Sequence, residues 1–249
     1  MYKTLFFLTI ALIISSCNQK KQPQIIDTGI IAVNATVNSQ NNEMSQWIAP
    51  YKKTLGEAMD IPLGVAAVKM TAGRPESLLG TLITTAMRDY ADKHGKSYDC
   101  AITNIGGIRD SIMEGEMTVG TIYSVFPFDN EFVILTISGK KMAELCQIIA
   151  RQGGQVTDGI KMIIDKKLRT GNNVKINNLP IDTNRNYKIL TTDYLAFGND
   201  FLFPMADYSE FYSFKVPLRD AIIDYIKNQN KMGKKINPIL KNEVIIGNL

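Results

Sequence analysis

Residues 131–151 read EFVILTISGKKMAELCQIIAR, and this stretch decides the fold class. Residues 131–138 are rich in β-branched, aromatic and leucine side chains, which is typical of a strand. Residues 139–151 carry apolar side chains at helical spacing, which is typical of an amphipathic helix. The stretch therefore predicts a strand that passes directly into a helix.

The flanking sequence alternates between the same two patterns. Helices are expected over residues 42–59, 76–94, 119–125 and 218–228, and strands over residues 61–70, 100–104, 160–165, 173–176, 187–191 and 243–246, with one or two more within residues 25–37. They do not follow a regular strand–helix–strand repeat, which favours an α+β fold over a doubly wound sheet. No linker-like stretch interrupts residues 25–249, so these residues are expected to form one domain.

The first seventeen residues, MYKTLFFLTIALIISSC, have the features of an export signal. A lysine precedes an apolar run that is too short for a permanent membrane span. Small residues before Cys17 are typical of a bacterial lipoprotein, so we expect residues 1–16 to be removed and Cys17 to be lipidated. The lipid would attach the protein to a membrane, with residues 17–24 as a polar tether. The alternative is a plain secretory peptide with an incidental cysteine.

Composition argues against several kinds of chemistry. The 249 residues include a single histidine, His94. Hydrolytic metal centres depend on several imidazole ligands, and Ser and Cys nucleophiles usually need an imidazole base. His94 lies among charged residues where a helix is expected to end, so it is interpreted as a solvated cap. The net charge of +4 is spread without a basic block, which argues against a nucleic-acid partner.

Two further cysteines, Cys100 and Cys146, stand in apolar surroundings at a strand start and on a helix. The oxidising conditions outside the cytoplasm permit a disulfide between them. Buried free thiols are the favoured interpretation, because cysteine packs well as a small hydrophobic side chain.

Four short stretches combine residue types that bind ligands. Residues 103–109, TNIGGIR, place paired glycines after a strand and end in an arginine, a forked donor for anions. Residues 125–130, VFPFDN, present an aromatic ring beside a proline turn. Residues 193–200, DYLAFGND, place a ring near a carboxylate, which suits the base and ribose of a nucleoside. Residues 74–82, RPESLLGTL, place Arg74 before a helix. Singly, each stretch is more often an ordinary turn.

In chain order these stretches give E-S-x-L-G-x-L-I-T-x-A-M-R, N-x-G-G-I-R-D-S-I, F-P-F-x-N and D-Y-L-A-x-G-x-D. The set resembles the C-terminal domain of the bacterial and animal 5′-nucleotidases, closely between residues 76 and 203. The resemblance implies a four-layer α/β/β/α sandwich. It also implies that the domain holds the substrate's nucleoside, with the base between two aromatic rings.

The resemblance assigns binding roles to individual residues. Phe128 would be one ring of the clamp, and Tyr194, where the family usually has phenylalanine, would be the other. Asp200 matches the carboxylate that binds ribose hydroxyls. The other matched positions belong to the N-x-G-G-I-R motif: Asn104, Gly106, Gly107 and Arg109. Arg74 lies near an arginine that the family uses, although its spacing to Gly80 need not match the family's.

Two departures from the family bear on function. The family's G-G-D-G-F is G-N-D-F-L over residues 198–202, which reduces backbone freedom around Asp200. The stretch between Cys17 and the first motif is too short for the metallophosphoesterase domain, which carries two metals and a catalytic Asn–His pair. We therefore expect no catalytic residue and no cofactor in this chain, with divalent metals on a separately encoded metallophosphoesterase partner.

The sequence thus predicts a component of a 5′-nucleotidase-type hydrolase that binds a nucleoside or nucleoside monophosphate for nucleotide catabolism. It is expected in the bacterial cell envelope, lipid-anchored at the outer membrane and facing the periplasm. Whether the chain is itself an enzyme stays open. One alternative is a stand-alone nucleoside-binding lipoprotein, and another is an envelope protein that keeps the fold for a structural or adhesive role.

Overall fold

The computed structural model describes residues 42–248. Contacts divide the chain into two units, residues 1–47 and residues 48–249. Of the first unit only residues 42–47 are described, and they begin helix α2 (Asn42–Met59). The expected signal, lipidated Cys17, tether and strands within residues 25–37 lie outside the described residues, so the domain boundaries stay predictions. Within residues 42–248 no helix is long and apolar enough to cross a membrane.

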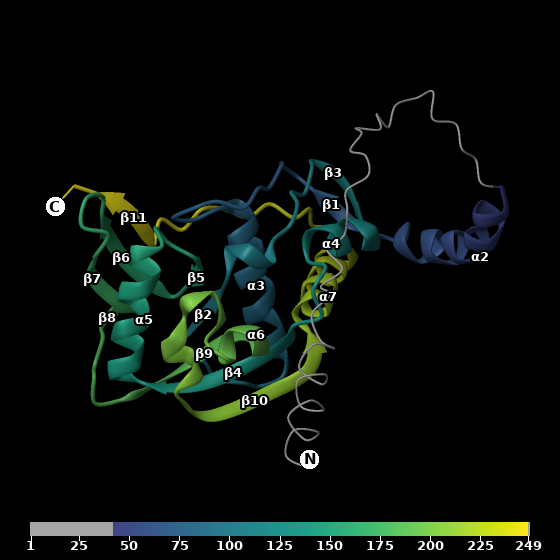
Figure 1. Cartoon of the computed structure of the whole chain (residues 1–249). Coiled ribbons are helices and arrows are strands. Elements are labelled where there is room, and N and C mark those ends of the chain that lie inside the picture. The colour runs from purple at the N-terminus through teal and green to yellow at the C-terminus, as the bar shows by residue number, and fades with distance from the viewer. Residues whose placement is uncertain (1–41, 249) are drawn as a thin grey trace, which may run out of the picture. The chain divides into compact units, whose positions relative to one another are not determined.

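The second unit mixes helices and strands in irregular order, which confirms the predicted α+β class (Figure 1). Its remaining helices are α3 (Leu78–Lys93), α4 (Val119–Val125), α5 (Gly139–Arg151), α6 (Asp193–Ala196) and α7 (Leu218–Lys231). Short 3-10 segments are η1 (Ile105–Gly107), η2 (Asn199–Phe201) and η3 (Phe203–Ala206).

The strands of this unit form three sheets. The largest has the order β10 (Tyr208–Pro217), β4 (Glu131–Ser138), β9 (Asn186–Thr192), β2 (Cys100–Thr103) and β5 (Val156–Asp158). Its pairs are antiparallel except β2 and β9, which are parallel. A second sheet has the order β11 (Val244–Gly247), β6 (Ile160–Asp165), β7 (Gly171–Ile176) and β8 (Leu179–Pro180), and the third pairs β1 (Pro62–Ala66) with β3 (Gly115–Thr118).

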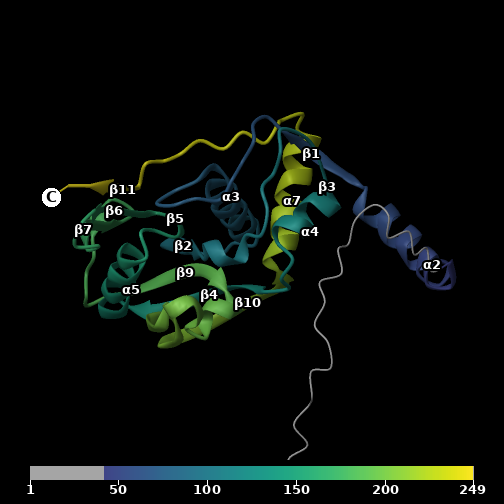
Figure 2. The same cartoon turned by 45° about the horizontal axis from the view of Figure 1, so that its top comes forward.

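Strand β4 shows why residues 131–138 are so apolar. Phe132 and Ile134 belong to a core shared with α3 and α7, whereas Val133 and Leu135 belong to a second core shared with α5 and β6. Figure 2 shows α3 and α7 on one side of the large sheet and α5 on the other. A strand covered on both faces loses the polar alternation of a half-exposed strand.

The expected ranges of α2, α4, α5, β4 and β6 agree with the structure. Helix α3 starts later than expected, because Ser77 caps it by accepting a hydrogen bond from the backbone N–H of Gly80 (3.1 Å). Glu76 instead accepts backbone N–H groups of Asn242 (2.8 Å) and Val244 (2.6 Å). This carboxylate therefore ties the C-terminal segment to the start of α3.

Residues 208–217, for which the patterns above predict no element, form strand β10 along β4. Their first half is largely exposed, and polar side chains interrupt the aromatic ones. An edge strand needs no apolar face of its own. Pairing with β4 holds the strand, together with Phe214 and Val216, which pack against the core from its second half.

His94 is the C-terminal cap of α3, as expected, and it is exposed. Its ring stacks on that of Tyr90, with centroids 4.2 Å apart. The structure gives this histidine a structural contact at a helix end.

Cys100 and Cys146 are both free and buried, which confirms the favoured interpretation. Burial raises the pKa of the Cys146 thiol to about 12 and that of Cys100 well above its usual value. Because the thiolate is the reactive form, we expect Cys100 and Cys146 in a Cys17→Ser background to react with Ellman's reagent at about pH 8 on the order of 100-fold more slowly in the native than in the guanidinium-unfolded protein. Rapid labelling of either cysteine in the native protein would contradict this packing.

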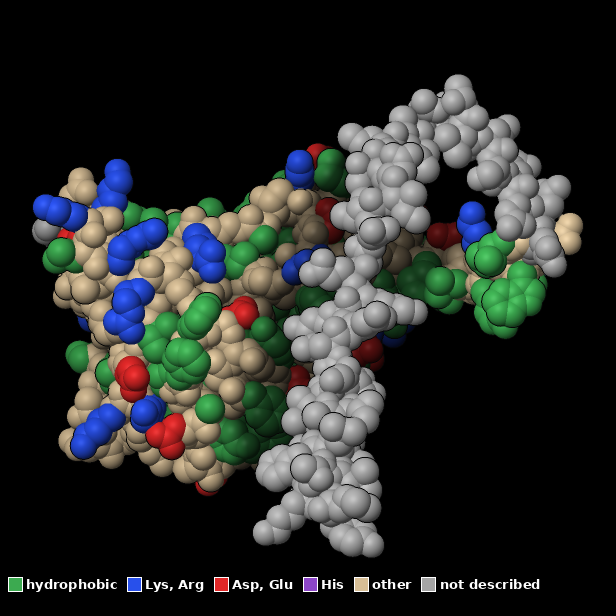
Figure 3. All heavy atoms as spheres, in the orientation of Figure 1, with side chains coloured by type: hydrophobic (Ala, Val, Ile, Leu, Met, Phe, Trp, Pro, Cys, Tyr) green, Lys and Arg blue, Asp and Glu red, His purple; other side chains and the backbone are tan. Residues whose placement is uncertain are grey.

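The exposed surface carries several aromatic rings. On the face in Figure 3, the lysine and arginine side chains lie in separate groups among polar and hydrophobic surface. Exposed rings occur in α2 and along β10, and another set lies near the end of β9 and in the F-P-F stretch: Tyr194, Phe197, Phe201, Phe203 and Phe128. Such rings are available to a ligand.

Candidate functional site

The centre of the candidate site is a hydrogen bond between two residues that lie 96 positions apart. The side-chain Nδ2 of Asn104 donates to Oδ2 of Asp200 at 2.5 Å, and the hydroxyl of Tyr194 donates to Oδ1 at 3.0 Å. Asn104 directly follows β2 and is 5% exposed. Tyr194 follows β9 at the start of α6. Parallel pairing of β2 with β9 brings the two strand ends together.

The paired glycines of the N-x-G-G-I-R motif make this approach possible. A Cβ on Gly106 would lie 3.2 Å from Oδ2 of Asp200, and one on Gly107 would lie 3.1 Å from Oδ1 of Asn104. Both contacts are closer than ordinary carbon–oxygen packing. The sequence predicts that the missing side chains of the glycines allow a ligand to approach the backbone. In the structure, the side chains of Asn104 and Asp200 occupy the positions next to these glycines.

The Asp200 turn has an uncommon backbone. Asp200 and Phe201 have φ angles of +54° and +62°, in the left-handed region that favours glycine. Where the sequence predicts a simple turn, the chain forms α6 followed by η2. Residues held in this region cost on the order of 1–3 kcal/mol each, so the surrounding contacts must stabilise the turn.

The hydroxyl of Tyr194 is the feature that a phenylalanine would lack. Donation to the Asp200 carboxylate raises the pKa of Tyr194, because ionisation would remove this hydrogen bond. The ring itself is 36% exposed. Tyr194 therefore orients Asp200 while its ring remains open to solvent.

The second predicted ring, Phe128, is 47% exposed. The guanidinium carbon of Arg109 lies 5.8 Å from the centre of this ring. Arg109 is exposed, and its Nη1 donates to the carbonyl of Gly106 at 3.4 Å. A cation beside an exposed ring suits a planar ligand that carries negative charge.

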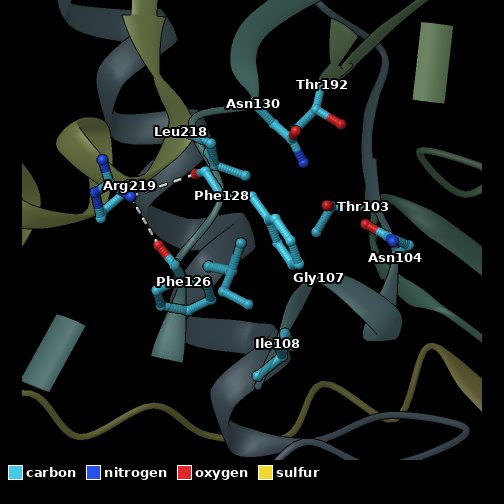
Figure 4. A pocket seen from close by; sticks show the side chains of 11 residues that line it. Thr103, Asn104, Gly107, Ile108, Phe126, Phe128, Asn130, Thr192, Leu218 and Arg219 are labelled. Carbon is cyan, nitrogen blue, oxygen red and sulfur yellow. Dashed lines mark hydrogen bonds between the residues drawn. The ribbon is translucent and has the colours of Figure 1, made fainter. Parts of the chain in front are cut away.

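A small pocket lies beside Phe128, whose ring projects toward Thr103 and Gly107 (Figure 4). Asn104, Asn130 and Thr192 also line it. The cavity volume is about 30 Å³, more than the roughly 10–15 Å³ that one enclosed water needs but room for only a few waters. A cavity of this volume does not enclose a ligand of nucleoside size.

Arg219 is a residue of the site that the sequence motifs do not reveal. It lies at the start of α7 and is 5% exposed. Its Nη1 donates to the carbonyls of Phe126 (3.0 Å) and Phe128 (3.4 Å), as the dashed lines in Figure 4 show. Its Nη2 pairs with Asp129, and the guanidinium lies 3.9 Å from the centre of the Tyr123 ring. Arg219 thus fixes the turn that presents Phe128.

Replacing Arg219 with methionine is expected to lower the free energy of unfolding by about 2–3 kcal/mol, because the buried Phe126 carbonyl loses its partner. Chemical denaturation measures this change. Asp129→Asn is the control, since it removes only the ion pair. Asp129 is 78% exposed, so that change is expected to cost less than about 1 kcal/mol. Equal effects of the two variants would mean that Arg219 does not hold the turn.

Arg74, the remaining predicted site residue, points elsewhere. Its Nε donates to the carbonyl of Gly154 at 2.8 Å. Among the described residues, no hydrogen bond or ion pair joins it to Asn104, Asp200 or Arg109, and it does not line the pocket beside Phe128.

The site residues do not form a metal centre. Within residues 42–248 there is no group of three or more His, Cys, Asp or Glu side chains that could hold a metal ion. Both oxygens of Asp200 already accept hydrogen bonds from Asn104 and Tyr194. The side chains offer ring faces, amides and one carboxylate, which suit a polar planar ligand.

Comparison with known proteins identifies relatives of this chain. Residues 56–208 match the family described as "5'-nucleotidase, C-terminal domain". The chain is 25% identical over 174 residues to the protein UshA of Yersinia enterocolitica, covering 65% of this chain and 30% of that protein. It is 27% identical over 172 residues to the 5′-nucleotidase of Vibrio parahaemolyticus, again covering 65% and 30%.

A solved structure shows the same fold. The 5′-nucleotidase precursor of Thermus thermophilus matches with a TM-score of 0.71 at 22% identity, over 84% of this chain and 44% of that one. The expected fold type is thereby confirmed. This chain spans less than half the length of each of these three proteins. The family match covers more than half of the chain, from residue 56 to residue 208, and the chain therefore belongs to the 5′-nucleotidase C-terminal domain family.

Proposed function

We propose that this domain binds a nucleoside or nucleoside monophosphate and supplies substrate recognition for phosphate-ester hydrolysis. The observation that carries the proposal is the Asn104–Asp200–Tyr194 cluster beside the exposed ring of Phe128, in a family of 5′-nucleotidase domains. The metal-bearing catalytic domain is supplied by a separate chain.

The exposed ring faces of Phe128 and Tyr194 take the base. Stacking of a base on an aromatic ring contributes about 1–3 kcal/mol. Asp200 takes the ribose hydroxyls, because a carboxylate has about four acceptor positions and Asn104 and Tyr194 use only part of them. Arg109 is exposed and takes the phosphate or a polar edge of the base.

Hydrolysis itself would depend on the partner. Two bound divalent metals there would activate the attacking water and stabilise charge on the phosphate. The contribution of this chain is to hold the nucleoside so that the phosphate is presented in one orientation.

The activity assay tests the proposal directly. Phosphate release from AMP with a divalent metal is measured with this chain alone, then with a separately purified metallophosphoesterase of the family. We expect little release from either chain alone and a clear increase when they are combined. Robust turnover by this chain alone would overturn the division of labour. Adenosine binding without stimulation of any partner would support a stand-alone binding protein.

We further propose that the chain is a lipoprotein of the bacterial outer membrane, with the domain facing the periplasm. The small residues before Cys17 support this placement. Incorporation of labelled palmitate, and its loss in a Cys17→Ser variant, tests the anchor. Soluble wild-type protein in the periplasmic fraction would argue for a plain secretory signal instead.

A further inference from the structure

Two glutamines outside the recognised motifs connect the loop that follows Asn104 with the turn that contains Asp200. Gln155 is 3% exposed and its Oε1 accepts the backbone N–H of Ile105 at 2.9 Å. Its Nε2 donates to Oε1 of Gln152 at 2.6 Å. Nε2 of Gln152 then donates to the backbone carbonyl of Asp200 at 2.8 Å. We call this connection the glutamine bridge.

The hydrogen bonds of the bridge can run from donor to acceptor in only one direction. At one end a backbone N–H requires an acceptor, and at the other a backbone carbonyl requires a donor. Each glutamine amide has one accepting oxygen and a donating NH₂ group. Both amides must therefore point the same way, and neither can be flipped without losing a bond at each end. Leu or Met at either position would break the chain of bonds.

The bridge closes a ring of contacts through the site. Ile105 directly follows Asn104, and the Asn104 side chain is bonded to the Asp200 side chain. The bridge joins the backbones of the same two loops. The loop that it reaches contains Asp200 and Phe201 in the left-handed conformation. A turn that costs energy persists only where surrounding bonds determine its geometry.

We infer that Gln152 and Gln155 are positioning residues that hold the Asn104 loop and the Asp200 turn in one binding geometry. The bridge stabilises the left-handed turn where the family's motif has glycines. The expected effect of the bridge on ligand binding rests on the proposed function. The coupling of the two loops by the bridge is independent of that function.

Gln147 provides a matched control on the same region of the chain. It lies on α5, and its amide makes two hydrogen bonds with the backbone of Gly171, at 2.8 and 2.9 Å. Gln147→Met therefore removes the same kind of bonds at a place away from both loops. Gln152→Met and Gln155→Met are the test variants, because methionine keeps the unbranched shape.

The first measurement needs no ligand. Amide resonances are compared by NMR in the wild type and the three variants. We expect Gln152→Met to shift residues 105–107, Gln155→Met to shift residues 199–201, and Gln147→Met to shift neither group. If Gln152→Met leaves residues 105–107 unchanged, the bridge does not couple the loops and the inference fails. Gln152→Glu repeats the test if a methionine variant does not fold, because its oxygens still accept from Gln155 but cannot donate to Asp200.

The second measurement is adenosine affinity by calorimetry. Gln152→Met and Gln155→Met are each expected to weaken adenosine binding by roughly 10-fold, since small losses of preorganisation are costly. The double variant is expected to bind no more weakly than either single variant, because one change already breaks the bridge. Gln147→Met should bind within about twofold of the wild type. If the loss of affinity in the double variant equals the product of the two single losses, the two glutamines act independently and the inferred bridge is wrong. Absence of adenosine binding by the wild type would instead refute the proposed function, and the NMR result would still decide the coupling.

Discussion

Replacing Phe128 with alanine is expected to weaken adenosine binding by roughly 5- to 150-fold, which corresponds to the loss of about 1–3 kcal/mol of stacking. The ring is 47% exposed, with the Arg109 guanidinium carbon 5.8 Å from its centre, and alanine offers a base no ring to stack on. Tyr194→Ala is expected to cost at least as much, because it removes both a ring and the hydrogen bond to Asp200. Calorimetry without metal measures both variants.

Two controls separate the contributions to this clamp. Tyr194→Phe keeps the ring and loses only the hydroxyl bond to Asp200, so its loss should be smaller than that of Tyr194→Ala. Phe197→Ala removes a ring that is 71% exposed in the same region but has no assigned role, and binding should stay within about twofold. Unchanged affinity in both Phe128→Ala and Tyr194→Ala would show that the rings do not clamp the base.

Replacing Gly139 with alanine is expected to destabilise the fold by more than about 3 kcal/mol. A Cβ at this first residue of α5 would lie 2.1 Å from the carbonyl oxygen of Asp182 and 2.8 Å from Cα of Thr183. Both neighbours are backbone atoms, so they cannot move aside as the end of a flexible side chain can. Urea denaturation measures the difference in the free energy of unfolding.

Gly56→Ala is the control for this prediction. Gly56 lies in α2, and a Cβ there would meet nothing within 4 Å. Alanine favours a helix by about 1 kcal/mol over glycine, so this change is expected to leave stability unchanged or slightly higher. If Gly139→Ala unfolds within about 1 kcal/mol of the wild type, helix α5 does not pack against residues 182–185 as described.

The sequence predicts elements best where one segment carries its own pattern. Strand β4 and helix α5 bury their apolar faces in the two cores, so their periodicity is visible along the chain. Strand β10 is different, because it is an edge strand paired with β4 whose first half is largely exposed. An exposed edge leaves little trace in composition. Strands β5 and β8 have three and two residues, which is too few to show a periodic pattern.

Some residues of the candidate site are predictable from local sequence patterns and others are not. The motifs identify Asn104, Tyr194 and Asp200, and the structure joins these three by hydrogen bonds. Arg219 and the two bridge glutamines act on backbone carbonyls and amides of distant segments. A side chain that binds another segment's backbone has no required spacing to that segment in the sequence. Only the folded chain reveals such partners.

The parallel pairing of β2 with β9 has a consequence for how this domain tolerates change. Asn104 leaves one of these neighbouring strands and Tyr194 follows the other, so the sheet sets the spacing of the binding groups. Within the long connection between the two strands, β4, β5 and the glutamine bridge support that spacing, whereas its exposed turns do not. Residues inserted at exposed turns along it, such as residues 166–170, should therefore leave ligand recognition intact. A scaffold of this kind can gain new loops without rebuilding its binding face.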